Sequence, residues 1–161
     1  MCDAIVAAAV PFKAAVIVND RADLAALAGA AGVHVGQEDL PPADARRLVG
    51  PAAIVGFSTH TVAQIEAAIR EPISYLAVGP VFGTQTKDTG YSAVGLELVS
   101  TAARLARPIP VVAIGGITID TAESVLQAGA TSVAVIGDLL SQGNPRGRVA
   151  AYLQRLAQHR V

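Results

Sequence analysis

The stretch GVHVGQEDLP, residues 32–41, begins with a short apolar run and ends in glycine and acidic residues. The same order recurs along the chain, with apolar runs at residues 14–18, 33–35, 53–57, 75–78, 111–114 and 133–136. Runs without sustained alternation of apolar and polar residues are typical of strands covered on both faces. Amphipathic stretches of helical length lie between them, at residues 24–31, 62–70, 96–105 and 121–128. This βα repeat predicts a parallel sheet in a single domain over residues 1–161.

Polar or glycine-rich residues follow every one of these runs. The exits read ND at 19–20, GQED at 36–39, STH at 58–60, GP at 79–80, GG at 115–116 and GD at 137–138. An open doubly wound sheet gathers ligand residues at one switch point, whereas a (β/α)₈ barrel collects them from nearly every strand. The α/β class and a TIM (β/α)₈ barrel are therefore favoured. Because such a barrel needs eight units and about 250 residues, we expect about six of the eight units here, with the first two absent.

Composition narrows the classes of function. A hydrophobic content of 52% excludes a long disordered chain, and a formal net charge of -1 provides no basic field for nucleic acid or an anionic membrane. No stretch approaches the roughly 20 apolar residues of a membrane span. The lone cysteine, Cys2, cannot form an internal disulfide, and the first residues lack a secretory-signal pattern. These features predict a cytoplasmic protein that binds neither nucleic acid nor membrane.

Two acidic residues stand directly beyond predicted strands. In a barrel, Asp20 and Asp39 would face the same bowl and could share one Mg²⁺, which binds one or two carboxylates and takes its other oxygens from water and phosphate. The alternative is that Asp20 caps the helix near Asp23 and that Asp39 is an ordinary loop residue. Glu38 competes with Asp39 for the same role.

The longest expected connection is residues 79–95, GPVFGTQTKDTGYSAVG. Connections longer than about 12–15 residues tend to be functional loops. Thr84, Thr86 and Lys87 are donors suited to closing over a phosphate group. The alternative is a solvated loop in which Lys87 only pairs with Asp88.

The last two predicted strands lead into Gly115, Gly116 and Gly137. In barrels of this class a phosphate is often held by backbone N–H groups after the last two strands, and glycine allows a close approach of the backbone. We expect a phosphate site there; the alternative is that these glycines only make tight turns.

One serine and one histidine complete the candidates. Ser58 precedes a capping pair, Thr61 with Gln64, so its hydroxyl remains available to a ligand oxygen. The pattern supplies no acid–base partner that would make Ser58 a nucleophile. His34 lies inside a predicted strand and is expected to pack in the core with one satisfied nitrogen.

Taken together, six segments resemble the thiamine-phosphate synthase family, in order and with fitting intervals. They are VNDRADLA at 18–25, GVHVGQEDLP at 32–41, GFSTHT at 56–61, GPVFGTQTKDTG at 79–90, VVAIGGI at 111–117 and VAVIGDLL at 133–140. The resemblance implies a transferase of thiamine biosynthesis. It would join the diphosphate ester of hydroxymethyl-aminopyrimidine to thiazole phosphate, giving thiamine monophosphate and pyrophosphate.

The resemblance also assigns residues. Asp20 and Asp39 correspond to the Mg²⁺ ligands, while Asn19, Ser58 and Lys87 correspond to contacts with the pyrimidine diphosphate, Ser58 and Lys87 being the catalytic pair. The thiazole phosphate would be held by Thr84, Gln85, Thr86, Gly116, Ile136 and Gly137. The pyrophosphate is expected to leave before the thiazole nitrogen attacks, so neither a protein nucleophile nor a strong base is needed.

The chain departs from the family pattern in two places. The family's Gln-x-Arg-Glu-Lys run has no counterpart, and Gly137 stands where many members have serine. Residues 1–161 alone are therefore expected to have little synthase activity and to associate through open sheet edges. Two alternatives remain: a barrel like the thiazole tautomerases, which use a histidine and lack the full metal and lysine set, or an inactive remnant that binds thiazole phosphate or a partner chain.

Overall fold

The structure is a computed structural model and describes residues 1–84, 90–141 and 143–157. Its six strands form one parallel sheet in which the spatial order follows the chain order. The strands are β1 (Ile17–Asn19), β2 (Gly32–Val35), β3 (Ile54–Thr59), β4 (Tyr75–Val78), β5 (Val111–Ile114) and β6 (Ser132–Ala134). A sheet without a reversal of strand order has no switch point, so the barrel prediction is confirmed over the open doubly wound alternative.

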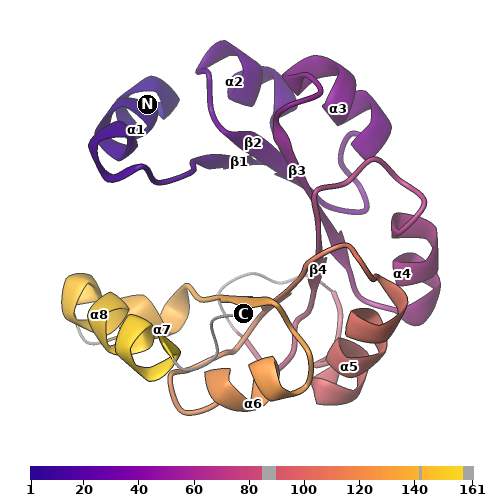
Figure 1. Cartoon of the computed structure of the whole chain (residues 1–161), viewed down its shortest axis with the longest axis vertical. Coiled ribbons are helices and arrows are strands. Elements are labelled where there is room, and N and C mark those ends of the chain that lie inside the picture. The colour runs from indigo at the N-terminus through magenta and orange to yellow at the C-terminus, as the bar shows by residue number, and fades with distance from the viewer. Residues whose placement is uncertain (85–89, 142, 158–161) are drawn as a thin grey trace.

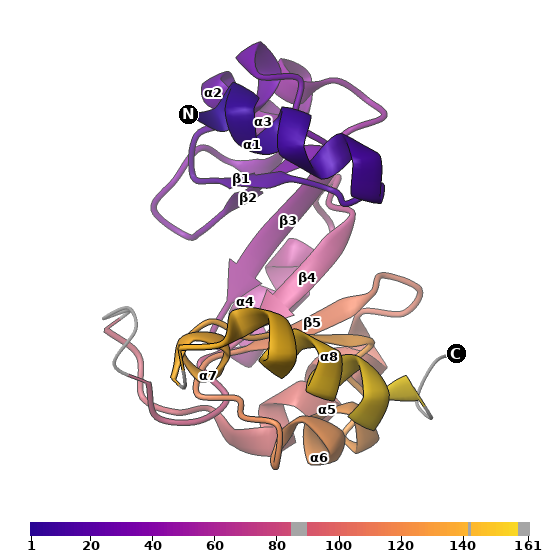
Figure 2. The same ribbon diagram turned by 90° about the vertical axis from the view of Figure 1, so that its left-hand side faces the viewer.

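The helices lie outside the curled sheet, and the strands and helices together make an incomplete ring (Figure 1). They are α1 (Cys2–Ala9), a 3-10 turn η1 (Val10–Phe12), α2 (Ala22–Leu27), α3 (Pro42–Val49), α4 (Val62–Ala68), α5 (Gly95–Leu105), α6 (Ala122–Gln127), α7 (Gly137–Leu140) and α8 (Pro145–Arg155). Among the described strands, β1 and β6 are the two edges of the sheet. Figure 2 shows α1 in the upper part of the molecule and α8 in the lower part.

Two strand ends differ from the predicted ones in ways that matter for the site. β3 continues beyond residue 57, because Ser58 and Thr59 pair with Ala77 and Val78 of β4. The buried Thr59 hydroxyl donates to the carbonyl of Ala77 at 2.9 Å, which satisfies a polar group inside the sheet. At the other end of the sheet, β6 stops at Ala134, so Ile136 lies at the start of α7 rather than in a strand.

The apolar core lies between the sheet and the surrounding helices. Val33, Val35 and Val55 are fully buried under α2 and α3, while a larger cluster around Leu76, Val78 and the helices α4 to α6 fills the second part. This packing leaves the carboxyl ends of the strands to carry the site. In the described part of the chain, no helix has the length and apolar character needed to cross a membrane.

Candidate active site

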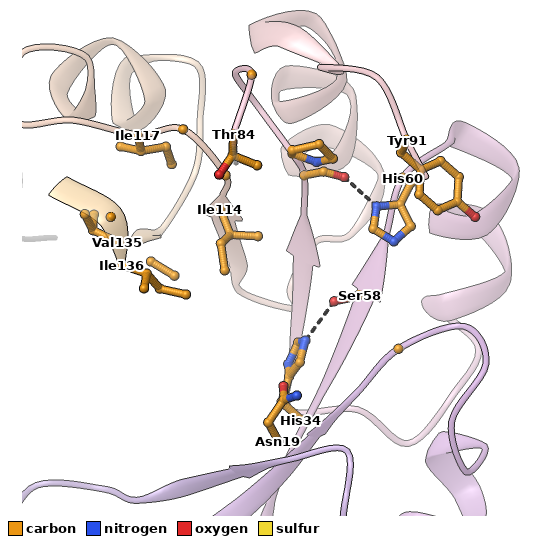
Figure 3. A pocket seen from close by; sticks show the side chains of 18 of the residues that line it. Asn19, His34, Ser58, His60, Thr84, Tyr91, Ile114, Ile117, Val135 and Ile136 are labelled. Carbon is orange, nitrogen blue, oxygen red and sulfur yellow. Dashed lines mark hydrogen bonds between the residues drawn. The ribbon is translucent and has the colours of Figure 1, made fainter. Parts of the chain in front are cut away.

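A cleft of about 970 Å³ opens at the carboxyl ends of the strands, and Figure 3 shows part of its lining. All eight of the predicted site residues that the structure describes line it: Asn19, Asp20, Asp39, Ser58, Thr84, Gly116, Ile136 and Gly137. Gln85, Thr86 and Lys87 lie outside the described residues. The fold thus brings together side chains and backbone from the first strand to the last.

Asp20 occupies an unusual backbone conformation at the end of β1. Its φ of 64° lies in the left-handed region, and its backbone N–H donates to the carbonyl of His34 at 2.8 Å. The N-cap of α2 is Arg21, whose side chain makes no capping hydrogen bond, so the capping position predicted for Asp20 is wrong by one residue. A left-handed non-glycine residue costs free energy and is concentrated at functional sites.

Asp39 closes the turn that follows β2. Its Oδ2 accepts a hydrogen bond from the backbone N–H of Gly36 at 2.7 Å. Glu38, the alternative candidate, also lines the cleft. Gln37, in the same loop, donates from Nε2 to the carbonyl of Ser58 at 2.6 Å, and this hydrogen bond connects the loop to β3. The loop after β2 is therefore held in place by hydrogen bonds within itself and to β3.

The acidic pair fits Mg²⁺ by its chemistry. Asp20 and Asp39 both line one cleft, and Mg²⁺, which prefers hard oxygen ligands, needs only one or two carboxylates beside water and phosphate oxygens. Within residues 1–84, 90–141 and 143–157, no group of three or more His, Cys, Asp or Glu side chains is placed to hold a metal. A cage made of protein ligands alone is thus absent from the described part of the chain.

Ser58 has a partner that sequence reasoning missed. Its Oγ lies 2.8 Å from Nε2 of His34, and Nδ1 of His34 lies 2.8 Å from the hydroxyl of Tyr75 (Figure 3 shows the first of these bonds). The expectation of a core histidine with one satisfied nitrogen is therefore wrong, because both ring nitrogens are bonded and His34 lines the cleft. Burial raises the pKa of the Tyr75 hydroxyl.

The glycines of the β5 exit are required by the fold itself. Gly115 and Gly116 have φ values of 99° and 65°, which L side chains rarely adopt. A Cβ on Gly115 would collide with Pro80, and one on Gly116 would collide with Phe82 and Gly83. The loops that follow β4 and β5 thus pack closely against each other, and Gly115 and Gly116 both line the cleft. The tight-turn alternative and the phosphate-site prediction are compatible.

Asp138, at the start of α7, is a second feature that sequence reasoning missed. Its Oδ1 pairs with Arg148 at 2.8 Å, and its Oδ2 accepts from the Tyr152 hydroxyl at 2.6 Å and the Ile119 N–H at 3.2 Å. Arg148 holds the pKa of Asp138 below its ordinary value. In the sequence, only its position in the GD exit pointed to Asp138. Its partners lie ten or more residues away, so no local pattern predicts these contacts. This carboxylate connects α7 and α8 to the β5–α6 loop.

A stacked pair of rings forms another wall of the cleft. His60 lies against Tyr91 with 3.9 Å between ring centroids and 15° between planes, and its Nδ1 contacts the carbonyl of Gly79 at 2.5 Å (Figure 3). The Tyr91 hydroxyl accepts from Nε2 of Gln64 at 3.2 Å. Thr61 Oγ1 in turn accepts from the backbone N–H of Gln64, which confirms the predicted capping contact.

A family model described as thiamine monophosphate synthase matches residues 1–139. The chain belongs to the thiamine monophosphate synthase family. Two relatives agree with this assignment, both thiamine-phosphate synthases. The protein from Koribacter versatilis is 48% identical over 92% of this chain. The protein from Anaeromyxobacter dehalogenans is 46% identical over 86% of this chain.

A solved structure agrees with the family membership. Thiamine phosphate pyrophosphorylase from Pyrococcus furiosus superimposes with a TM-score of 0.88 and 29% identity over 98% of this chain and 75% of that one. The chain spans 69% and 62% of the lengths of the Koribacter and Anaeromyxobacter relatives. The fold that surrounds the cleft is thus similar to that of a thiamine phosphate pyrophosphorylase.

Proposed function

We propose that the cleft condenses hydroxymethyl-aminopyrimidine diphosphate with thiazole phosphate, giving thiamine monophosphate and pyrophosphate. The observation that carries the proposal is the convergence of Asp20, Asp39, Ser58 and Gly116 on one cleft. They come from four different strands or the loops that follow them: Ser58 lies in the last part of β3, and the other three lie just beyond β1, β2 and β5. Carboxylates, a hydroxyl donor and bare amides are the groups needed to hold two phosphorylated rings.

The chemistry asks the protein to manage charge rather than to attack. The bond between the pyrimidine methylene carbon and the diphosphate oxygen breaks, the electron pair leaves with pyrophosphate, and the thiazole nitrogen then bonds to that carbon. Stabilising the charge that develops on the leaving group and aligning the two rings are the main contributions available. Ser58 donates a hydrogen bond to the diphosphate, and Lys87 supplies countercharge.

Mg²⁺ is the proposed cofactor, held by Asp20 and Asp39. When bound, it neutralises diphosphate charge. The Gly36 N–H holds one oxygen of the Asp39 carboxylate before any ligand arrives, and Asp20 sits in a left-handed backbone conformation directly after β1. Asn19, at the end of β1, offers an amide to the pyrimidine diphosphate on the same side of the cleft.

The second substrate is assigned to the other side of the cleft. Backbone amides at Gly116 and Gly137 are proposed to bind the thiazole phosphate together with Thr84, Gln85 and Thr86. Ile136 is half exposed at the cleft and provides an apolar surface for the thiazole ring. This phosphate stays on its substrate throughout, so amide donors suffice to hold it.

The proposal extends to partners and setting. The described edge strands β1 and β6 present unpaired backbone groups and β-branched side chains, which favours association with further chains. Light scattering of the purified protein tests this: a monomer at all concentrations would refute it. The proposed compartment is the cytoplasm.

The test of the activity is product formation. The protein, in the longest form that its gene encodes upstream of Met1, is incubated with both substrates and Mg²⁺, and thiamine monophosphate and pyrophosphate are quantified. We expect both products in equal amounts, with loss of turnover in Lys87→Ala and on chelation of the metal. Isomerisation of a thiazole carboxylate without condensation would favour the tautomerase alternative. Binding of thiazole phosphate without any turnover would favour the inactive remnant.

A further inference from the structure

His34, Gly56 and Tyr75 occupy paired positions on three neighbouring strands next to Ser58. His34 of β2 pairs in register with Gly56 of β3, and Gly56 pairs with Tyr75 of β4. Side chains at directly paired positions point to the same face of a sheet. Ser58 lies two residues beyond Gly56 and therefore on that same face. The register thus places an imidazole and a phenol on either side of a glycine, next to the serine.

Gly56 leaves the space in which the two rings meet. A Cβ at this position would fall on the Tyr75 ring, on its hydroxyl and on Nδ1 of His34. Without it, the rings stack with centroids 5.5 Å apart and planes 19° apart, and the Nδ1 to hydroxyl distance is 2.8 Å. Any other residue in the middle of β3 would separate the pair.

The proton positions along this chain of contacts follow from hydrogen-bond satisfaction. Tyr75 is protonated at neutral pH, since the ordinary tyrosine pKa is about 10 and burial raises it further, and its hydroxyl contacts Nδ1 of His34. A half-buried hydroxyl that failed to donate would lose a hydrogen bond. Donation to Nδ1 makes that nitrogen an acceptor, so the proton of the neutral imidazole sits on Nε2. Nε2 then donates to Ser58 Oγ, 2.8 Å away.

We propose that Tyr75 and His34 are positioning residues that turn Ser58 into a hydrogen-bond donor toward the diphosphate. With Oγ already accepting from His34, its own O–H is the group left to face the cleft. The opposite proton order would present oxygen lone pairs to an anion and weaken its binding. The identity of the anion rests on the proposed function, whereas the proton order does not.

The proton order is tested without any substrate. The ¹⁵N chemical shifts of the His34 ring are measured in the purified chain at about pH 8, above the ordinary imidazole pKa of about 6.5. We expect the Nε2–H form in the parent, a loss of this preference in Tyr75→Phe, and no change in Tyr91→Phe. Tyr91 is the matched control, because its hydroxyl contacts Gln64 instead. An Nδ1–H ring in the parent would overturn the proposal.

The action through Ser58 is tested with inorganic pyrophosphate and Mg²⁺ by titration calorimetry. His34→Asn should weaken binding about ten-fold, the loss of one hydrogen bond to a charged group. His34→Gln, whose amide nitrogen can replace Nε2 as the donor, should restore most of this affinity. In a Ser58→Ala background, His34→Asn should have no further effect.

Additive losses from the Ser58 and His34 substitutions would overturn the positioning role, because they would mean that His34 acts on the anion independently. Absence of pyrophosphate binding by the parent would overturn the assignment of the anion. The two proposals fail separately. A confirmed tautomer and coupling without thiamine monophosphate formation would refute only the synthase activity, whereas product formation with an Nδ1–H ring would refute only the positioning role.

Discussion

The two halves of the cleft use different parts of the polypeptide. At the carboxyl ends of β1 to β3, much of the lining consists of side chains that carry charge or hydroxyl groups, with Asp20, Asp39 and Ser58 among them. Beyond β4 to β6 it is made largely of glycine backbone and aliphatic walls, including Gly116 and Ile136. A leaving diphosphate that gains charge needs countercharge, whereas a spectator phosphate can be held by neutral amides.

The two halves of the cleft are also held in place by different interactions. The charged half is held by hydrogen bonds between neighbouring strands and loops, such as Gly36 to Asp39 and His34 to Ser58. The half beyond β4 to β6 is held by close packing around Gly115 and Gly116 and by the partly buried Asp138–Arg148 pair. Substitutions should therefore affect turnover most in the first half and stability most in the second.

The largest effect is expected at the acidic pair. Asp39→Asn keeps an oxygen to accept from Gly36 but removes the charge, so turnover should fall about 10³-fold, or about 4 kcal/mol. Thiamine monophosphate formation and circular dichroism are measured together. Glu38→Gln is the matched control, since it removes a neighbouring exposed carboxylate. An equal loss in both variants would mean that turnover depends on the total negative charge of this loop rather than on Asp39 itself.

In the half of the cleft beyond β4 to β6, substitutions should mainly lower the free energy of unfolding. The Asp138 and Arg148 side chains are 10% and 19% exposed, so Asp138→Asn leaves a partly buried guanidinium without its charged partner. The free energy of unfolding in urea should fall by about 2–3 kcal/mol, because hydrogen bonds to a charged carboxylate are lost. Asp44→Asn, which breaks an ion pair whose side chains are 44% and 78% exposed, serves as the control with no measurable change.

The same carboxylate predicts a pH dependence. Because the folded pKa of Asp138 is lowered, its stabilisation is complete above the ordinary carboxyl pKa of about 3.9 and is lost as pH falls through the lower folded value. The difference in unfolding free energy between the parent and Asp138→Asn should therefore shrink in acid. A difference that grew on acidification would contradict this assignment.

A smaller effect is expected at the glycine loop. Gly116→Ala places a side chain in a left-handed conformation and against Phe82, which should cost about 2 kcal/mol and weaken thiazole phosphate binding. Calorimetry with thiazole phosphate and thermal unfolding measure the two effects. Gly83→Ala is the control from the same cleft, because no atom lies within 4 Å of its Cβ.

The smallest effect is expected at the cap of α4, just beyond Ser58. Thr61→Ala removes the oxygen that accepts from the Gln64 N–H, and the unfolding free energy should fall by about 1 kcal/mol with turnover retained. Thr61→Ser keeps the acceptor and should behave as the parent. A large loss of turnover in Thr61→Ala would show that the two halves are less independent than described above.

The amino-acid pattern predicted the order of the strands, the barrel class and most of the described site residues, whereas the resemblance to the family added Asn19 and Ile136. The predictions made from the pattern depend on local order: a buried run followed by a polar or glycine-rich segment. Parallel strands bring all such exits to one edge, so residues as distant as Asp20 and Gly137 meet without any knowledge of packing. The family motifs carried the same information in another form.

Tertiary structure alone decided the contacts that orient these residues. His34 reaches Ser58 and Tyr75 across 24 and 41 residues, and it does so only because the register places it beside a glycine in β3. Asp138 contacts Arg148 because α8 packs against α7. Hydrogen-bond partners act over about 3 Å, and no periodicity in the chain encodes which distant side chains the packing brings within that distance.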